Sequence, residues 1–154
     1  MRHTREMATL RRSFQLLRSF RFEQTRPEIF YGGLAEDTAA LVDNLGRDLG
    51  VELPGARVLD VGGGPGYFAD AFARRGAHYV GLEPDAGEMS AAGIHLSNSV
   101  RGDGTNLPFA DNSFDVVYSS NVAEHIPNPW DMGEEMLRVT PVSYTHLTLP
   151  TICS

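Results

Sequence analysis

Four glycines follow an apolar strand pattern, and they constrain the fold more than any other feature of the chain. The stretch VLDVGGGPGYFADAF, residues 58–72, places Gly62, Gly63, Gly64 and Gly66 between that strand and a helical pattern. Glycine loses the most backbone entropy on folding, so such a cluster indicates a sharp bend or a close approach to another group. In open α/β sheets, ligands bind at the carboxyl ends of the strands, beside helix N-termini with free N–H groups. We therefore interpret the cluster as the floor of a site for a nucleotide-like ligand, because a simple turn needs fewer glycines.

The rest of the chain alternates helical and strand patterns. Helices are expected at 6–23, 35–49, 66–76, 85–93 and 129–139, and strands at 57–62, 78–84, 98–104 and 113–121. Pro27 should interrupt the first helical pattern. Strands that alternate with helices at this spacing predict an α/β fold with a parallel sheet and right-handed crossovers.

Composition limits the classes of function. The chain has 154 residues, one cysteine and a formal net charge of −7. This charge argues against nucleic acid as a partner, and no apolar run is long enough to span a membrane. One cysteine allows no disulfide within the chain, and no signal peptide is evident, so we expect a cytoplasmic protein. The histidines are too scattered to predict a metal site.

Glycine spacing separates the kinds of nucleotide site. The dinucleotide pattern G-x-G-x-x-G fails, because Tyr67 or Pro65 falls where a glycine is required. The phosphate-loop pattern fails because the chain has no lysine. The spacing that fits is acid-x-G-x-G-x-G, formed by Asp60, Gly62, Gly64 and Gly66.

Three stretches resemble class I S-adenosylmethionine-dependent methyltransferases, nearest to the type 11 group. VLDVGGGPGYF is similar to the first motif of that family, Glu83 in YVGLE matches its second-strand acid, and residues 102–126 resemble its third and fourth motifs. The match runs from about Arg57 to Thr140. It implies a Rossmann-like fold with strand order 3-2-1-4 in the part present, N-terminal capping helices, and S-adenosylmethionine as the cofactor.

The resemblance also implies roles for single residues. Glu83 would accept the ribose hydroxyls, Asp103 the adenine amino group, and Pro84 would pack on the adenine ring. The expected cofactor-binding residues are Asp60, Gly62, Gly64, Gly66, Glu83, Pro84, Asp103, Gly104, Ser119 and Asn121. The less favoured alternatives are that Glu83 is a surface acid and Asp103 a turn residue.

The expected reaction is direct in-line methyl transfer to a small-molecule acceptor, without a metal. A general base is needed only if the acceptor must lose a proton. His125 is the candidate, and a structural histidine is the alternative interpretation. Tyr31 and Tyr67 fit a pocket lining or an aromatic core. Two other functions stay open: an NAD-dependent oxidoreductase and a non-catalytic nucleotide-binding module.

The pattern of the family stops after Thr140. The segment VSYTHLTLPT resembles one reading frame of a transposon-end sequencing adapter. We therefore expect a helical cap at 1–50, an incomplete S-adenosylmethionine-binding domain at 51–140 that lacks its C-terminal strands, and a non-native tail at 141–154. A fragment of this kind should be inactive alone. The oligomeric state is not predicted.

Overall fold

Four parallel strands form one sheet in the order β3-β2-β1-β4. The structure is a computed structural model, and it describes residues 25, 27–90, 98–120 and 122–141. The strands are β1 (Arg57–Val61), β2 (His78–Glu83), β3 (Ser99–Arg101) and β4 (Val116–Tyr118). Both the parallel arrangement and the order 3-2-1-4 are confirmed.

The described helices are α2 (Pro27–Asp48), α3 (Ala69–Ala73), α4 (Ala86–Ser90) and α5 (Pro129–Arg138), with a short 3-10 helix, η2 (Ala123–His125). The helix predicted at 35–49 begins earlier, at Pro27, because the first turn of a helix does not need the N–H group that proline lacks. That Pro27 interrupts the helix expected at 6–23 stays a prediction, because those residues lie outside the described part of the chain. The helix expected at 6–23 and most of the tail lie outside the described residues.

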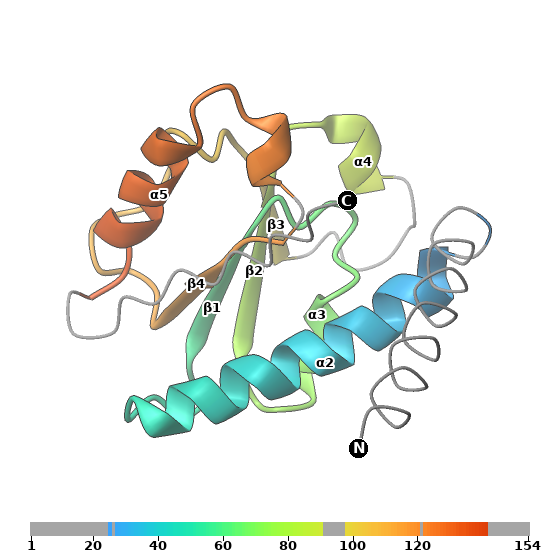
Figure 1. Ribbon diagram of the computed structural model, residues 1–154, viewed down its shortest axis with the longest axis vertical. Coiled ribbons are helices and arrows are strands. Elements are labelled where there is room, and N and C mark those ends of the chain that lie inside the picture. The colour runs from blue at the N-terminus through green and yellow to red at the C-terminus, as the bar shows by residue number, and fades with distance from the viewer. Residues whose placement is uncertain (1–24, 26, 91–97, 121, 142–154) are drawn as a thin grey trace, which may run out of the picture.

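The sheet carries a separate apolar cluster on each face. Side chains of β1 alternate, so Val58 points to one face, and Leu59 and Val61 point to the other. The first cluster includes Ala35 and Ala39 of α2, and the second includes buried methionines of α5. Figure 1 shows α2 as the blue-to-teal helix that crosses the lower part of the molecule, well away from α5 in orange. The helix that precedes the sheet thus belongs to its core, whereas the predicted domain boundary at residue 50 stays a prediction.

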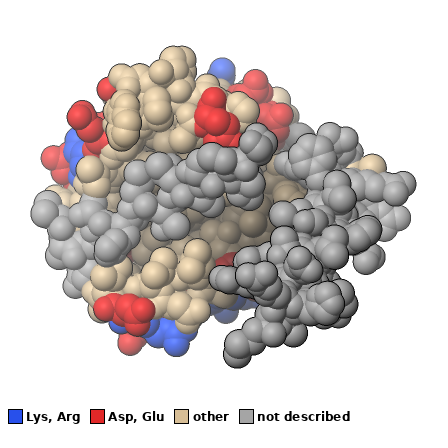
Figure 2. Space-filling view, viewed as in Figure 1, with Lys and Arg blue, Asp and Glu red and all other residues tan. Residues whose placement is uncertain are grey.

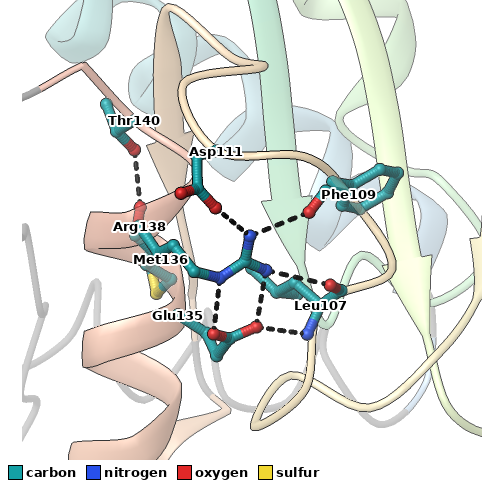
Figure 3. A network of polar contacts seen from close by, with 7 residues as sticks. All are labelled: Leu107, Phe109, Asp111, Glu135, Met136, Arg138 and Thr140. Atoms are coloured by element: carbon teal, nitrogen blue, oxygen red, sulfur yellow. Dashed lines mark hydrogen bonds and ion pairs between the residues drawn. The ribbon is translucent and has the colours of Figure 1, made fainter.

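Arg138, in the last turn of α5, holds the loop that leads into β4 (Figure 3). Its guanidinium donates to both carboxylate oxygens of Glu135 at 2.7 and 2.8 Å, and to Asp111 Oδ1 at 2.7 Å. It also donates to the carbonyl oxygens of Phe109 and Leu107, at 2.9 and 3.0 Å. Glu135 accepts the Leu107 N–H at 2.7 Å in return. One side chain therefore fixes the path of residues 107–111 against α5.

Candidate functional site

The glycine loop after β1 turns through three residues in the left-handed region. Gly62, Gly64 and Gly66 have φ angles of +84°, +50° and +87°. In this region an L side chain brings Cβ close to the following carbonyl oxygen, whereas glycine adopts it freely. These three glycines are the ones that the spacing acid-x-G-x-G-x-G selects. The motif is thus explained by backbone geometry.

Gly63 is required for a different reason. A Cβ atom on Gly63 would lie 3.0 Å from Tyr79 Oη and 3.3 Å from Asp60 Oδ2. In contrast, a Cβ atom on Gly64 would meet nothing within 4 Å. The loop therefore packs tightly on its inner side at Gly63 and faces open space at Gly64.

That open space is part of a cavity of about 600 Å³ at the carboxyl edge of the sheet. Its walls come from the glycine loop, the end of β2, the turn after β3, the segment around η2, and one residue of α2. The lining residues are Tyr31, Val61, Gly62, Gly63, Gly64, Pro65, Tyr67, Phe68, Leu82, Glu83, Pro84, Glu88, Asp103, Gly104, Ser120, Val122, His125 and Ile126. This is the edge at which open α/β sheets bind ligands.

The cavity brings together most of the residues predicted for the site. Those that line it are Gly62, Gly64, Glu83, Pro84, Asp103, Gly104 and His125. Asp60, Gly66 and Ser119 do not line it: Asp60 is buried behind the loop, and Ser119 Oγ donates to the carbonyl oxygen of Val61 at 2.8 Å. Asn121 lies outside the described residues.

Glu83 faces the glycine loop from the end of β2. Its Oε2 accepts the Gly64 N–H at 3.1 Å, and its Oε1 accepts the Asp85 N–H at 3.1 Å. These two bonds fix the orientation of the carboxylate. Because each carboxylate oxygen has more than one lone pair, both oxygens can accept further hydroxyl donors.

Asp103 is a turn residue and a lining residue at once. Its Oδ1 accepts from the Thr105 backbone N–H at 2.8 Å and from Thr105 Oγ1 at 2.9 Å. These bonds lower the pKa of Asp103, with the backbone N–H as the larger cause. Asp103 therefore presents a negative charge to the cavity at neutral pH, and the two interpretations of its sequence context are compatible.

Asp60 is 2% exposed and lies in the middle of β1. Its Oδ2 accepts hydrogen bonds from the hydroxyls of Tyr79 and Tyr118, each at 2.7 Å. Burial raises the pKa of Asp60 to about 6, although the two hydrogen bonds favour the ionised form. The glycine loop therefore separates this carboxylate from the cavity.

Several lining residues were not predicted from the sequence. Glu88 of α4 adds a third carboxylate, and Val122 and Ile126 add apolar surface on either side of η2. Glu88 belongs to none of the sequence motifs, and Val122 and Ile126 cannot be told from ordinary core residues in the sequence. Tyr31 and Tyr67 stack with ring centroids 4.9 Å apart and an interplanar angle of 6°, and they both line the cavity and pack against the first cluster. Both interpretations of these tyrosines are thus correct.

Charge at this edge of the molecule is mainly negative. Figure 2 shows Asp and Glu side chains gathered along the upper margin of the visible face, where α4 and α5 lie in the same view.

Within the described ranges, no three His, Cys, Asp or Glu side chains are grouped to hold a metal ion. In the same part of the chain, no helix has the length and apolar character needed to cross a membrane.

The fold and the site together define a Rossmann-like protein with a cavity at the carboxyl edge of its sheet. Comparison with known proteins gives the family. Residues 59–141 match the model of the methyltransferase domain, and the chain belongs to this family.

Two mycobacterial relatives are described as uncharacterized methyltransferases. The protein of Mycolicibacterium gilvum is 59% identical over 138 residues, which cover 86% of this chain and 54% of the relative. That of Mycobacteroides abscessus is 58% identical over 143 residues, which cover 88% and 55% of the two chains. The chain therefore spans about half the length of these relatives. A solved S-adenosylmethionine-dependent methyltransferase from Mesorhizobium loti is 25% identical, with a TM-score of 0.51, and the match covers 61% of this chain and 46% of that one.

Proposed function

We propose that the protein of which this chain forms part transfers a methyl group from S-adenosylmethionine to a small-molecule acceptor. One observation carries the proposal. The left-handed Gly64 lies against open space beside Glu83, at the carboxyl edge of a sheet with methyltransferase topology. A ligand can approach the backbone directly at this position.

The donor and acceptor groups of the cavity suit S-adenosylmethionine. Besides its own carboxylate, this cofactor carries a sulfonium, an ammonium, two ribose hydroxyls and an adenine amino group, and these four kinds of group interact favourably with carboxylates. The cavity has three carboxylates, from Glu83, Glu88 and Asp103. Among the described lining residues there is no arginine or lysine. A dinucleotide with two phosphates would be repelled by this set of charges, which argues against the NAD-dependent alternative.

When bound, S-adenosylmethionine supplies an electrophilic methyl group on a good leaving group, so the chain's residues must mainly hold two reactants in line and exclude water. Tyr31, Tyr67 and Val122 offer apolar surface for this purpose. His125 can accept a proton if the acceptor is an acidic hydroxyl, thiol or amine. Its backbone N–H donates to the Val122 carbonyl at 2.9 Å, so the residue also belongs to the structure of η2.

The net charge of the chain and the greater length of its relatives bear on the methyl acceptor. The net charge of −7 supports a small molecule over nucleic acid as the acceptor. Cytoplasmic localisation and the absence of a membrane partner stay predictions. Because the match covers only about half of each relative, we expect the remaining residues of those proteins to complete the acceptor site and this chain to be inactive alone.

Calorimetry on the 154-residue chain tests the cofactor. We expect binding of S-adenosylmethionine and S-adenosylhomocysteine, and no binding of NAD. Glu83→Ala should weaken the binding, whereas Glu52→Ala, an exposed acid outside the cavity, serves as the matched control. Binding of NAD without binding of S-adenosylmethionine would refute the proposal.

A further inference from the structure

The buried side chains beneath the glycine loop form a cluster that the proposed function does not use. Asp60 belongs to β1, Tyr118 is its register partner on β4, and Tyr79 reaches it diagonally from β2. The register partner of Asp60 on β2 is Gly81, and a Cβ atom there would lie 3.4 Å from Tyr79 Oη. The missing side chain of Gly81 therefore leaves room for the Tyr79 hydroxyl to reach the carboxylate.

The cluster lies close beneath Gly63 of the loop. A Cβ atom added to Gly63 would lie 3.0 Å from Tyr79 Oη and 3.3 Å from Asp60 Oδ2. These two oxygen atoms are hydrogen-bonded to each other. The Gly63 N–H donates to the Leu82 carbonyl at 3.1 Å, and the adjacent Gly64 N–H donates to Glu83. The carboxylate and the hydroxyl thus lie beneath the residue that precedes Gly64, which faces the cavity.

Aromatic packing fixes the two tyrosines independently of their hydroxyls. Phe72 lies with its ring centroid 6.0 Å from that of Tyr79 and 5.3 Å from that of Tyr118. Phe68 lies 6.0 Å from Tyr118. A phenylalanine at position 79 or 118 would keep these contacts and lose only the hydrogen bond to Asp60.

The charges around Asp60 can be named element by element. On β2 the charged group is Glu83, which disfavours a second negative charge. On β4 the titratable group is Tyr118, and its pKa is raised well above 10 by burial, so it remains a hydroxyl donor. On α3, Asp70 is exposed, and on α2, Glu36 pairs with Arg74 and Arg75. The two tyrosine hydroxyls are therefore the groups that favour the ionised carboxylate against burial and Glu83.

We propose that Tyr79 and Tyr118 are positioning residues that keep Asp60 ionised and fixed beneath Gly63, so that the glycine loop receives a cationic ligand. This inference rests on the proposed function, since the ligand is S-adenosylmethionine. A negative charge behind the loop stabilises the cation in front of it, and the two short hydrogen bonds hold the carboxylate where it supports Gly63. The two hydroxyls thus affect the cavity without lining it.

Calorimetric titration with S-adenosylmethionine between pH 5 and pH 8 tests the inference. We expect the affinity of the native chain to fall below about pH 6, the pKa of Asp60. In the variant with both Tyr79→Phe and Tyr118→Phe, the midpoint of this fall should rise by roughly one pH unit or more, because hydrogen bonds to the charged form are lost. Asp60→Asn should remove the dependence. In His125→Gln the midpoint should stay in place, which separates Asp60 from the histidine in the cavity.

A second measurement uses no ligand. Urea unfolding of the native chain and the double variant, across the same pH range, reports the titration of Asp60 in the folded state, and its midpoint should move upward in the double variant. A folded double variant that binds with an unmoved midpoint would overturn this inference alone. Failure of the native chain to bind S-adenosylmethionine at every pH would overturn both this inference and the proposed function.

Discussion

Replacing Gly64 with alanine tests whether the glycine loop is the floor of the ligand-binding site. The residue has a φ of +50° and lines the cavity, and an added Cβ atom would meet no protein atom within 4 Å. The substitution therefore places a methyl group in the cavity and nowhere else. Its effect on folding and its effect on binding have separate causes and can be measured separately.

The expected magnitudes follow from these two causes. Holding alanine in the left-handed region costs about 1–2 kcal/mol, with no additional cost from a clash. A domain of ordinary stability, about 5–15 kcal/mol, stays folded after such a loss. A ligand that lies against the loop must move away from the new methyl group. We expect at least a roughly tenfold loss of affinity, which corresponds to about 1.4 kcal/mol. Valine, which is larger and β-branched, should abolish binding.

Two matched glycines serve as controls. Gly33, within α2, has no atom within 4 Å of an added Cβ, so Gly33→Ala should stabilise the protein by roughly 0.5–1 kcal/mol through helix propensity. Gly63→Ala should destabilise it through the close contacts with Tyr79 and Asp60. Urea unfolding gives the stabilities, and calorimetry with S-adenosylmethionine gives the affinities. If Gly64→Ala binds as well as the native chain, the glycine loop is not the floor of the site.

Three further predictions concern charged side chains. Glu83→Ala should weaken S-adenosylmethionine binding by one to two decades, about 1.5–3 kcal/mol, and unchanged calorimetric affinity would remove Glu83 from the site. Burial raises the pKa of Asp60 from 3.8 to about 6, so the protonated side chain stabilises the folded state below pH 3.8, and this stabilisation is lost as the pH rises through 6. Relative to Asp60→Asn, the free energy of unfolding should therefore fall by on the order of 2–3 kcal/mol between pH 4 and pH 7. Parallel pH profiles of the two proteins would contradict this. Arg138→Met should lower the melting temperature clearly more than Arg47→Met. Arg138 joins α5 to the 107–111 loop, whereas Arg47 bonds within α2 among the described residues; equal melting temperatures would show that the loop contacts contribute little.

The sequence predicts the sheet well because strand and loop signals are local. The apolar runs of β1 and β2, and the glycines between β1 and α3, depend on neighbouring residues, so the strands and the glycine loop could be predicted from them. The strand order came instead from the family resemblance. Glu83 and Asp103 could be placed at the cavity because Glu83 ends a strand pattern and the family resemblance points to Asp103, and both residues line it. These features need no knowledge of which side chains meet.

Contacts between distant segments could not be predicted in this way. Tyr79 and Tyr118 read as ordinary strand residues, and only the register of three strands shows that both reach Asp60. Asp60 itself was expected to contact the cofactor, whereas the structure buries it behind the loop. Val122 fills the space beside Gly62, where an added Cβ would lie 2.2 Å from Cγ2, and a sequence gives no distance between two loops.

The shared core of α2 and the sheet bears on how proteins of this kind can be recombined. The family match begins at residue 59, yet Ala35 and Ala39 pack with Val58 and Phe72, and Tyr31 reaches the cavity. Glu36 adds ion pairs to Arg74 and Arg75 on the far side of the boundary. A chimera joined at the start of the family match would expose the first apolar cluster and open one wall of the cavity. A segment exchanged between such proteins should therefore include the whole of α2 and begin at or before Pro27.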